Sequence, residues 1–483
     1  MDGSQPEDDR DPGAGGPKPK AGGIVPPEAR TDRMSLAEVH ESVSVPDSGT
    51  GFWKQWRAFT GPALLVSVGY MDPGNWGTDL QGGAQFKYGL LWVVGLASLM
   101  AIFLQVLAAR LGVVAGRDLA QCCRQWYPRW TRLPNWMFCE IAIIATDLAE
   151  ALGSAVAINL LFHIPLLWAL CITALDVMFL LALQSVGMRL IEAIVTMLVA
   201  TIALCYGIEI FILPQTQPSF LEMARAFIAP SLAGNGMLYM AIGIIGATVM
   251  PHNLYLHSAL VQSRKFQKDP ASIRAAVKFN TIDSSVALVL AFFVNAAILV
   301  LAAMVFYGKD GVTLPGGSMV AFNPDSDWIR VAYLTLAPLL GTALASTIFG
   351  VALLASGQSS TITGTLAGQV VMEGFMQWRV RPEVRRVITR LLAITPAIAI
   401  IALHGDGSVT DIIVLSQVVL GMQLPFAMFP LLVFTGSRAR MGIWRNGWLL
   451  TIAGWGSALL ITALDIYGLP DSLAAVWQVV SGG

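Results

Sequence analysis

Two short motifs interrupt long apolar stretches of the chain and carry the side chains best suited to bind a cation. In Asp72-Pro73-Gly74-Asn75, the aspartate offers an anionic oxygen and the asparagine a neutral carbonyl oxygen, three residues apart on one side of the chain. Proline removes a backbone donor and glycine loosens the chain, so we predict that the helix unwinds here. The alternative is that Asp72 caps the helix that begins at Pro73, although a cap can also bind an ion.

The second motif, Met250-Pro251-His252, adds a thioether to the possible ligands. Softer transition-metal ions accept thioether sulfur, whereas Mg2+ and Ca2+ do not. The chain has 19 methionines, and most methionines in apolar segments only fill space. The position of Met250 directly before a helix-breaking proline favours a ligand, because paired breaks in two membrane helices are typical of a transporter binding site.

Two histidines in this segment do not have the spacing of a zinc protease site. Such sites place two histidines four residues apart with a glutamate beside the first, whereas His252 and His257 are five apart with no glutamate between them. We therefore predict that His252 moves protons or shapes a gate, and that His257 is a packed polar residue.

Two acids in another apolar stretch, Asp147 and Glu150, are spaced to lie on one face of a helix. Carboxylates that face each other inside a membrane protein repel when both are ionised, so at least one is expected to hold a proton that it can exchange. Alternatively, arginines neutralise both. The candidate partners are Arg385, Arg386 and Arg390, and such a pairing would itself offer a proton exit path.

The remaining polar residues in apolar stretches are less specific. Gln417 can add an amide oxygen to the cation site once the outer side closes, or it can bridge helices. Asp176, Glu192, Asp283 and Asp465 are interpreted as structural or interfacial residues.

Composition places the chain among polytopic membrane proteins. Of its 483 residues, 55% are hydrophobic and only 13% are charged, which excludes an ordinary soluble protein of this length. A net charge of -1 offers no basic surface, which excludes a nucleic-acid partner. Lys and Arg concentrate instead in alternate loops, and this bias predicts a cytoplasmic N-terminus and an extracytoplasmic C-terminus in the cell membrane.

Eleven apolar segments are long enough to cross a lipid bilayer, which takes about 20 helical residues. They begin near Ala58, Leu90, Trp136, Leu166, Leu190, Leu238, Val277, Val331, Val387, Val409 and Trp448. The stretch from Val331 to Phe375 is interpreted as one long helix. The two breaks lie in the first and sixth segments, so we predict an all-α membrane fold with two inverted five-helix repeats and one extra helix.

These segments predict the organisation of the chain. Residues 1–50 are rich in Asp, Pro, Gly, Ser and Lys and form a disordered cytoplasmic tail. The first repeat covers residues 51–215 and the second covers residues 237–436. The eleventh span covers residues 444–468, and residues 469–483 form a short extracytoplasmic tail.

The motifs closely resemble those of the Nramp (natural-resistance-associated macrophage protein) family in its bacterial form. The matching segments are Tyr70–Trp76, Thr146–Glu150 and Ile245–Asn253, and the resemblance covers roughly residues 52 to 468. It implies a fold like that of the leucine transporter and proton-coupled import of Mn2+ or Fe2+. No cofactor is implied, because the metal ion is the transported substrate, and a single chain in the lipid bilayer is sufficient.

The resemblance also implies roles for individual residues. The implied metal site consists of Asp72, Asn75, Met250, the main-chain carbonyl of Ala247 and, in occluded states, Gln417. The backbone near Gly69 contributes in some states. The implied proton pathway includes Asp147, Glu150 and His252, together with the ninth-span arginines Arg385 and Arg386.

Import by alternating access is therefore the predicted function, and the chain is not predicted to be an enzyme. Two alternatives remain open. A cation channel would need rings of like residues from several subunits, whereas this chain has one asymmetric set. A sodium-coupled amino-acid symporter of the same fold would need a helix N-terminus free of acids for the substrate carboxylate, yet Asp72 stands there.

Overall fold

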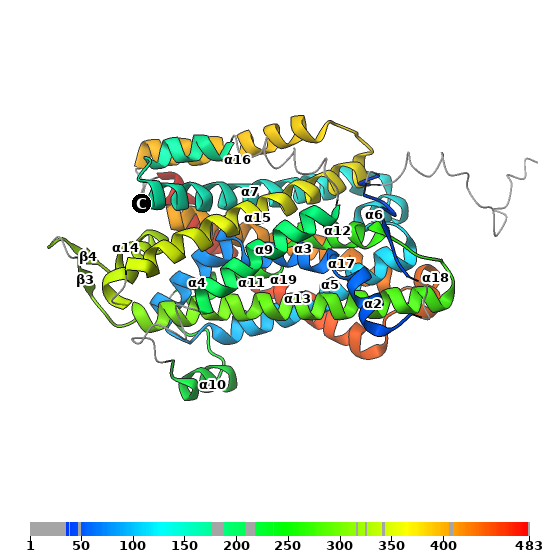
Figure 1. The fold of residues 1–483 in the computed structure, drawn as a ribbon, viewed down its shortest axis with the longest axis horizontal. Helices are drawn as coiled ribbons and strands as arrows, with labels where there is room; N and C mark the ends of the chain where they lie inside the picture. Colours follow the sequence, from blue (N-terminus) through cyan, green and yellow to red (C-terminus); the bar gives the residue numbers. More distant parts are fainter. Residues whose placement is uncertain are drawn as a thin grey trace, which may run out of the picture.

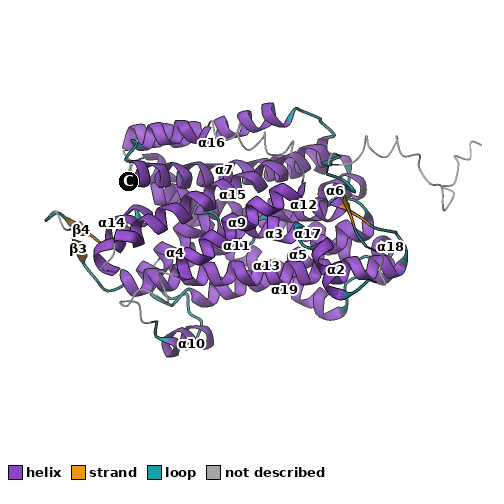
Figure 2. Ribbon diagram, viewed as in Figure 1, coloured by secondary structure: helices purple, strands orange, loops and turns teal. Residues whose placement is uncertain are grey.

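Long helices that lie side by side form the body of the molecule in the computed structural model (Figure 1). The structure describes residues 35–37, 39–46, 50–174, 188–207, 218–234, 236–314, 317–323, 326–340, 343–404 and 409–481. Within these residues, strands are confined to two short pairs near the ends of the bundle (Figure 2). Asp176, which we interpreted from the sequence as a structural or interfacial residue, lies outside this part of the chain.

The first half of the bundle contains α2 to α10. Its helices are α2 (Phe52–Phe59), α3 (Pro62–Ser67), η1 (Val68–Met71), α4 (Pro73–Phe86), α5 (Leu91–Ala115), α6 (Leu119–Trp126), η2 (Arg129–Thr131), α7 (Arg132–Phe162), α9 (Met188–Gly207) and α10 (Phe220–Ile228). A further helix covers residues 166–174.

The second half contains the elements from α11 onward. Its helices are α11 (Met237–Thr248), α12 (Pro251–Leu260), η4 (Val261–Ser263), α13 (Pro270–Val305), α14 (Trp328–Leu340), α15 (Ala343–Met376), α16 (Pro382–His404), α17 (Val409–Gly436), α18 (Arg438–Met441), η6 (Gly442–Trp444) and α19 (Trp448–Ser481). The strands are β1 (Val43–Ser44), parallel to β2 (Arg264–Lys265), and β3 (Gly311–Thr313), antiparallel to β4 (Met319–Ala321).

Seven of the described helical segments are long and apolar enough to cross a membrane. They correspond to α5, η2 with α7, α11 through η4, α13, most of α16, α17 and most of α19, and Pro62–Met71 is a shorter apolar segment. The first predicted span is divided into two short helices by its break. The spans predicted near Leu166 and Leu190 extend into residues that the structure does not describe. The count of eleven therefore stays a prediction.

Both predicted helix breaks are confirmed. In the first segment, α3 tightens into the 3-10 turn η1, Asp72 has extended backbone (φ -72°, ψ 169°), and α4 restarts at Pro73. In the sixth segment, α11 ends at Thr248, Met250 is extended (φ -71°, ψ 124°), and α12 restarts at Pro251. Proline at the first helical position fits because that residue needs no intrahelical N–H.

Several of the loops and short helices that connect the long helices lie at the two ends of the bundle. The arginine-containing segments α6, β2 and α18 lie at the same end as α2, near the right of Figure 1. The segments α10, α14 and β3–β4 lie at the other end, together with the C-terminus (Figure 1). The chain thus begins its helical body at one end and finishes at the opposite end.

The interpretation of Val331–Phe375 as one helix is wrong. The stretch forms two helices, α14 and α15, and the Ser346 hydroxyl at the start of α15 donates a hydrogen bond to the Tyr333 carbonyl in α14. On one continuous helix, residues thirteen apart would be about 20 Å from each other. The chain therefore folds back, and the longer helix of this region is α15, with 34 residues.

The prediction of a disordered tail over residues 1–50 is wrong for the described residues between 35 and 46. Leu36 is buried, and its amide donates to Glu373 Oε2 in α15 at 2.9 Å. The Glu41 amide donates to the Gln262 carbonyl at 3.0 Å, and β1 then pairs with β2 directly after the sixth segment. Backbone hydrogen bonds, which the composition of the segment does not reveal, hold it in place.

Candidate metal and proton site

The first break leaves Asp72 with two different carboxylate oxygens. Oδ1 accepts a hydrogen bond from the Asn75 amide at 2.8 Å, so Asp72 is the N-cap of α4. Oδ2 has no hydrogen-bond partner in the described part of the chain, although the side chain is fully buried. The capping interpretation is therefore confirmed, and the cap still leaves one oxygen for an ion.

The Asn75 side chain joins the two breaks. Its amide nitrogen donates to Asp72 Oδ1 at 2.8 Å, to the Ala247 carbonyl at 3.2 Å and to the Gly69 carbonyl at 3.3 Å. These three oxygens come from residues at or directly beside the breaks in the first and sixth segments. The two breaks thus meet around a single buried atom.

Met250 presents its sulfur to the same region. Asn253, one turn into α12, donates its side-chain amide to the Met250 sulfur at 3.3 Å. A methyl group added to Gly69 would lie 3.3 Å from that sulfur and would overlap the Asn253 amide. Glycine at position 69 therefore makes the space in which the thioether approaches the first break.

Gln417 in α17 closes the group of predicted ligands. Its amide lies so close to Gly74 that any side chain at position 74 would overlap it. Its Oε1 atom has no hydrogen-bond partner among the described residues. The structure thus gathers the five predicted ligand residues, and each of the five is buried.

Carboxylates, histidines and cysteines alone cannot build a metal site here. Within the described residues, no group of three or more such side chains is placed to hold a metal ion. Any ion at the breaks would therefore be held by one carboxylate together with amide, main-chain carbonyl and thioether ligands.

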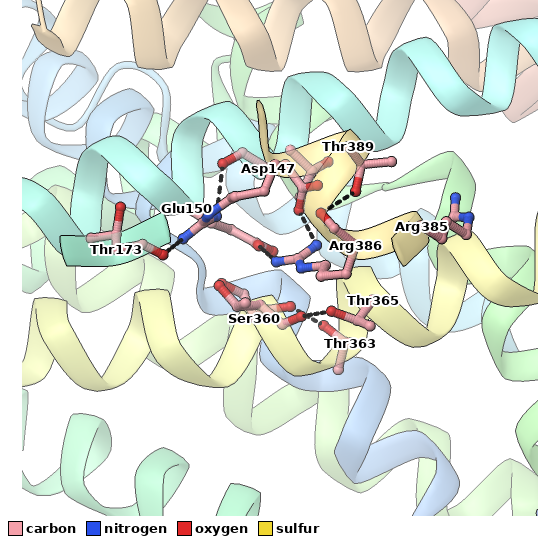
Figure 3. Close-up of polar contacts among 12 residues, drawn as sticks. Asp147, Glu150, Thr173, Ser360, Thr363, Thr365, Arg385, Arg386 and Thr389 are labelled. Atoms are coloured by element: carbon pink, nitrogen blue, oxygen red, sulfur yellow. Dashed lines mark hydrogen bonds and ion pairs between the residues drawn. The ribbon is translucent and has the colours of Figure 1, made fainter. Parts of the chain in front are cut away.

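A second polar cluster lies between α7 and α16 (Figure 3). The Arg386 guanidinium is 2.5 Å from Asp147 Oδ1 and 3.7 Å from Glu150 Oε2. Arg390 donates to the Asp147 carbonyl at 3.2 Å and to the Thr173 carbonyl at 3.1 Å. The prediction that arginines of the ninth span neutralise the two acids is confirmed for Arg386.

Arg385 does not join this cluster, so its predicted pairing with Asp147 or Glu150 is wrong. Its guanidinium makes two hydrogen bonds to Glu140, at 3.0 and 2.9 Å, and points away from Arg386 in Figure 3. Consecutive residues on a helix point about 100° apart, which separates the two arginines. Glu140 was not identified from the sequence, although it lies seven residues before Asp147 and hence on the same face of α7.

His252 and His257 have different surroundings. His252 follows the second break, and its Nδ1 atom has no hydrogen-bond partner in the described chain. His257 Nδ1 is 2.9 Å from Gln105 Oε1, which confirms its prediction as a packed polar residue.

Glu192 and Asp283 hold the start of the first segment. Arg264 pairs with Glu192 Oε1 at 3.0 Å and donates to the Ala58 and Thr60 carbonyls at 3.1 and 2.6 Å. Asp283 Oδ2 accepts from the Gly61 amide at 3.3 Å and from the Ala63 amide at 3.0 Å. Their interpretation as structural residues is in keeping with these contacts.

Two further amides at the metal site were not identified from the sequence. They belong to Asn253, described above, and to Asn295 in α13. The Asn295 amide donates to the Tyr70 carbonyl at 2.8 Å and to Asn75 Oδ1 at 3.2 Å. An isolated asparagine in an apolar helix is a usable signal, because an amide there needs a partner. Nothing in the local sequence says which partner.

These contacts have counterparts in known proteins. A family model described as "Natural resistance-associated macrophage protein-like" matches residues 63–471. The chain belongs to the Nramp family. A "Divalent metal cation transporter MntH" of Nostoc sp. is 51% identical over 453 residues, which are 93% of this chain and 98% of the relative. Relatives of the same name from Listeria innocua and Bradyrhizobium diazoefficiens are 47% and 48% identical.

Solved structures place the chain in the same family. A manganese transporter of Eremococcus coleocola, solved with a bis-isothiourea compound, superimposes with a TM-score of 0.82 at 38% identity, over 92% of both chains. Mhp1, a nucleobase-cation-symport-1 transporter, gives a TM-score of 0.57 at 12% identity over 87% of this chain. The predicted all-α membrane fold of the leucine-transporter type is confirmed by this Nramp match, and the Mhp1 likeness adds to it at the level of the fold alone.

Proposed function

We propose that this Nramp protein is a proton-coupled secondary transporter that imports Mn2+ and Fe2+ by alternating access. The observation that carries the proposal is the convergence of both helix breaks on Asn75, whose amide nitrogen touches oxygens of Asp72, Gly69 and Ala247. The names of the relatives, divalent metal cation transporter and manganese transporter, agree with this function.

In the proposed metal site, Asp72 supplies the charge and Met250 the selectivity. Asn75, Gln417 and the Ala247 carbonyl complete the ligand set with neutral oxygens. A thousandfold preference for Mn2+ over Ca2+ or Mg2+ requires about 4 kcal/mol. A thioether provides such a difference because hard ions gain little from sulfur and lose a hydration oxygen to it.

In the proposed proton pathway, Glu150 and Asp147 exchange the proton and Arg386 compensates the charge left behind. A divalent cation beside Asp72 and a proton on Glu150 repel each other, since Asp72 and Glu150 interact electrostatically. Arrival of the metal thus favours departure of the proton. His252 lies between the break and Asp147 in this scheme, and the Arg385–Glu140 pair continues the pathway along α7 and α16.

The membrane potential adds to the driving force. If α2 faces the cytoplasm, an inside-negative potential favours entry of two positive charges by about 4.6 kcal/mol per 100 mV, and one proton adds about 2.3 kcal/mol. Coupling to protons therefore increases accumulation of the metal but is not required for entry.

Uptake into liposomes tests the proposal. Purified protein is reconstituted with a metal-sensing dye and a pH dye inside, and external Mn2+ is added under an imposed potential. We expect both signals for the wild type, and at least a thousandfold lower uptake for Asp72→Ala, equal to about 4 kcal/mol. Asp465→Ala is the control, because Asp465 is a buried acid in α19 outside both clusters.

The outcomes separate the alternatives. Undiminished metal and proton signals in Asp72→Ala would contradict the proposal. Uptake that does not saturate with Mn2+ concentration would instead indicate a cation channel. Sodium-dependent uptake of labelled amino acids, without metal uptake, would indicate an amino-acid symporter.

A further inference from the structure

The Asn75 amide is turned the wrong way round for a metal ligand. The atom that faces the Gly69 and Ala247 carbonyls lies 3.3 and 3.2 Å from them. Carbonyl oxygens only accept hydrogen bonds, so this atom is the NH2 nitrogen. A cation would be repelled by these hydrogens and would need the amide oxygen instead.

The oxygen end of the same amide points to the sixth and seventh segments. Asn75 Oδ1 accepts from the Asn295 amide at 3.2 Å and from the Thr248 hydroxyl at 3.5 Å. Asn295 uses the same nitrogen to donate to the Tyr70 carbonyl at 2.8 Å. Its own Oδ1 is buried and has no hydrogen-bond partner in the described part of the chain.

The NH2 group of Asn75 thus lies where a cation bound to the same three oxygens of Asp72, Gly69 and Ala247 would lie. It donates to three buried oxygens, and a buried oxygen left without a donor is costly inside a protein. The Asn75 side chain thus holds Asp72, Gly69 and Ala247 close together.

We infer that Asn75 and Asn295 form a two-amide relay that transmits metal occupancy from the site to the unwound turn of the first segment. The inference rests on the proposed metal transport. To ligate a metal, Asn75 must rotate its amide and turn its NH2 group toward Asn295. Two NH2 groups cannot face each other, so Asn295 rotates as well and presents its unpartnered oxygen.

Rotation of Asn295 has a structural consequence. Its nitrogen leaves the Tyr70 carbonyl, and this breaks the hydrogen bond by which Asn295 of α13 holds η1 at the break. Metal binding thereby releases Val68–Met71 from α13. Asn295 is a positioning residue in this scheme, because it acts through Asn75 and never touches the ion.

Asn295→Leu tests the relay, with Asn280→Leu as the matched control. Asn280 is also a buried asparagine of α13, but its nitrogen bonds to Ala276 in its own helix, at 2.8 Å. Mn2+ affinity is measured by isothermal titration. Hydrogen–deuterium exchange of the peptide covering Val68–Met71 is measured with and without Mn2+, on full-length protein in detergent.

We expect Mn2+ to raise exchange of this peptide about twofold or more in the wild type and in Asn280→Leu. In Asn295→Leu the tie is absent in both states, so exchange is fast and no longer depends on Mn2+. Mn2+ should bind Asn295→Leu about 2- to 10-fold more tightly, because metal binding no longer has to break the hydrogen bond from residue 295 to the Tyr70 carbonyl. Asn295→Asp also lacks the donor to Tyr70 and should show the same fast exchange if the leucine variant misfolds.

Three results are distinguishable. Wild-type protein that binds no Mn2+ would overturn the proposed function together with the relay. Wild-type binding combined with an unchanged Mn2+-dependent exchange in both Asn295 variants would overturn the relay alone. Equal loss of the exchange response in Asn280→Leu would show a general effect of polar residues in α13 and would also overturn the relay.

Discussion

The two polar clusters in the bundle, at the helix breaks and between α7 and α16, differ in whether their buried carboxylates are paired with an arginine. Asp72 at the breaks is fully buried, has one oxygen without a partner and forms no ion pair among the described residues. Asp147 and Glu150 are equally buried, but Arg386 lies against both. The cluster at the breaks has no cationic side chain paired with its carboxylate among the described residues, whereas the cluster between α7 and α16 contains Arg386.

This difference supports the proposal that the cluster at the breaks binds the external cation. A buried carboxylate without compensation is costly, and that cost is removed when a cation binds. A carboxylate pair with a resident arginine gains less from a metal ion, which the arginine would repel. The second cluster is better suited to a proton, because protonation of an acid needs no new ligands.

The largest expected effect comes from breaking the compensated cluster. Arg386→Leu leaves two acids without their arginine, and we expect a loss of about 3–5 kcal/mol in the free energy of unfolding. Asp72→Asn removes a charge that has no ion-pair partner in the described chain, so the metal-free protein should keep its stability or gain. Thermal unfolding of the purified proteins without metal measures both.

Adding Asp147→Asn to Arg386→Leu should restore part of the stability, because one uncompensated charge disappears. The contrast between the clusters is refuted if Asp72→Asn destabilises the protein as much as Arg386→Leu.

An intermediate effect is expected from the sulfur in the uncompensated cluster. Met250→Ala should weaken Mn2+ uptake about 10- to 100-fold, equal to about 1.4–2.7 kcal/mol, while Ca2+ and Mg2+ become stronger competitors. Competition of each ion against Mn2+ uptake in liposomes is the measurement. Met240→Ala in α11 is the control, because Met240 is a buried methionine outside the predicted ligand set.

A competition profile that Met250→Ala leaves unaltered would mean that the sulfur has no part in selectivity. The difference between the two clusters would then rest on charge alone.

The last expected effect concerns Asp118, a buried acid outside the membrane-spanning helices. Asp118 caps α6, and burial raises its pKa to about 6, although the Gln121 amide donates to it at 2.8 Å. Its pKa is higher in the folded state than in the unfolded state, so its contribution to stability is present at low pH and is lost as the pH rises through about 6. Asp118→Asn keeps a capping side chain and should add about 2 kcal/mol at pH 7.5.

Unfolding measured at pH 4.5 and pH 7.5 checks this sign, and the gain at the lower pH should be about a third of the gain at the higher pH. Asp269→Asn provides the opposite case. Asp269 is an exposed cap whose pKa is lowered by hydrogen bonds, first of all from Ser272, so its replacement should not stabilise at pH 7.5. A gain from Asp118→Asn that is equal at both pH values would mean that its charge is not responsible.

The two breaks were predictable because their signals are local. Proline and glycine act on the backbone at their own positions, and Asp72 and Met250 stand directly beside a proline. The five residues predicted as metal ligands from the motifs and the family resemblance also lie together in the structure. Their mutual arrangement through Asn75 was not predictable, because hydrogen bonds between residues 172 positions apart leave no periodic pattern.

The errors have physical causes as well. The prediction of one helix over α14 and α15 relied only on the length of the apolar stretch. It ignored Pro338 and Gly341, which are residue types that often end helices. We predicted that Arg385 and Arg386 share partners because they are adjacent in sequence. Adjacent residues on a helix point in different directions, and Arg385 contacts Glu140 instead. The described residues between 35 and 46 looked disordered because their contacts are made mainly by the backbone, which composition does not report.

The parallel pairing of β1 with β2 connects the N-terminal segment to the chain directly after the second broken helix. A bulky fusion or an affinity tag placed close before residue 35 would pull on Val43 and Ser44, and through them on Arg264 and Lys265 directly after η4. A fusion at the far end of α19 has no such connection to the described breaks. Labels for functional work on this protein therefore belong at the C-terminus.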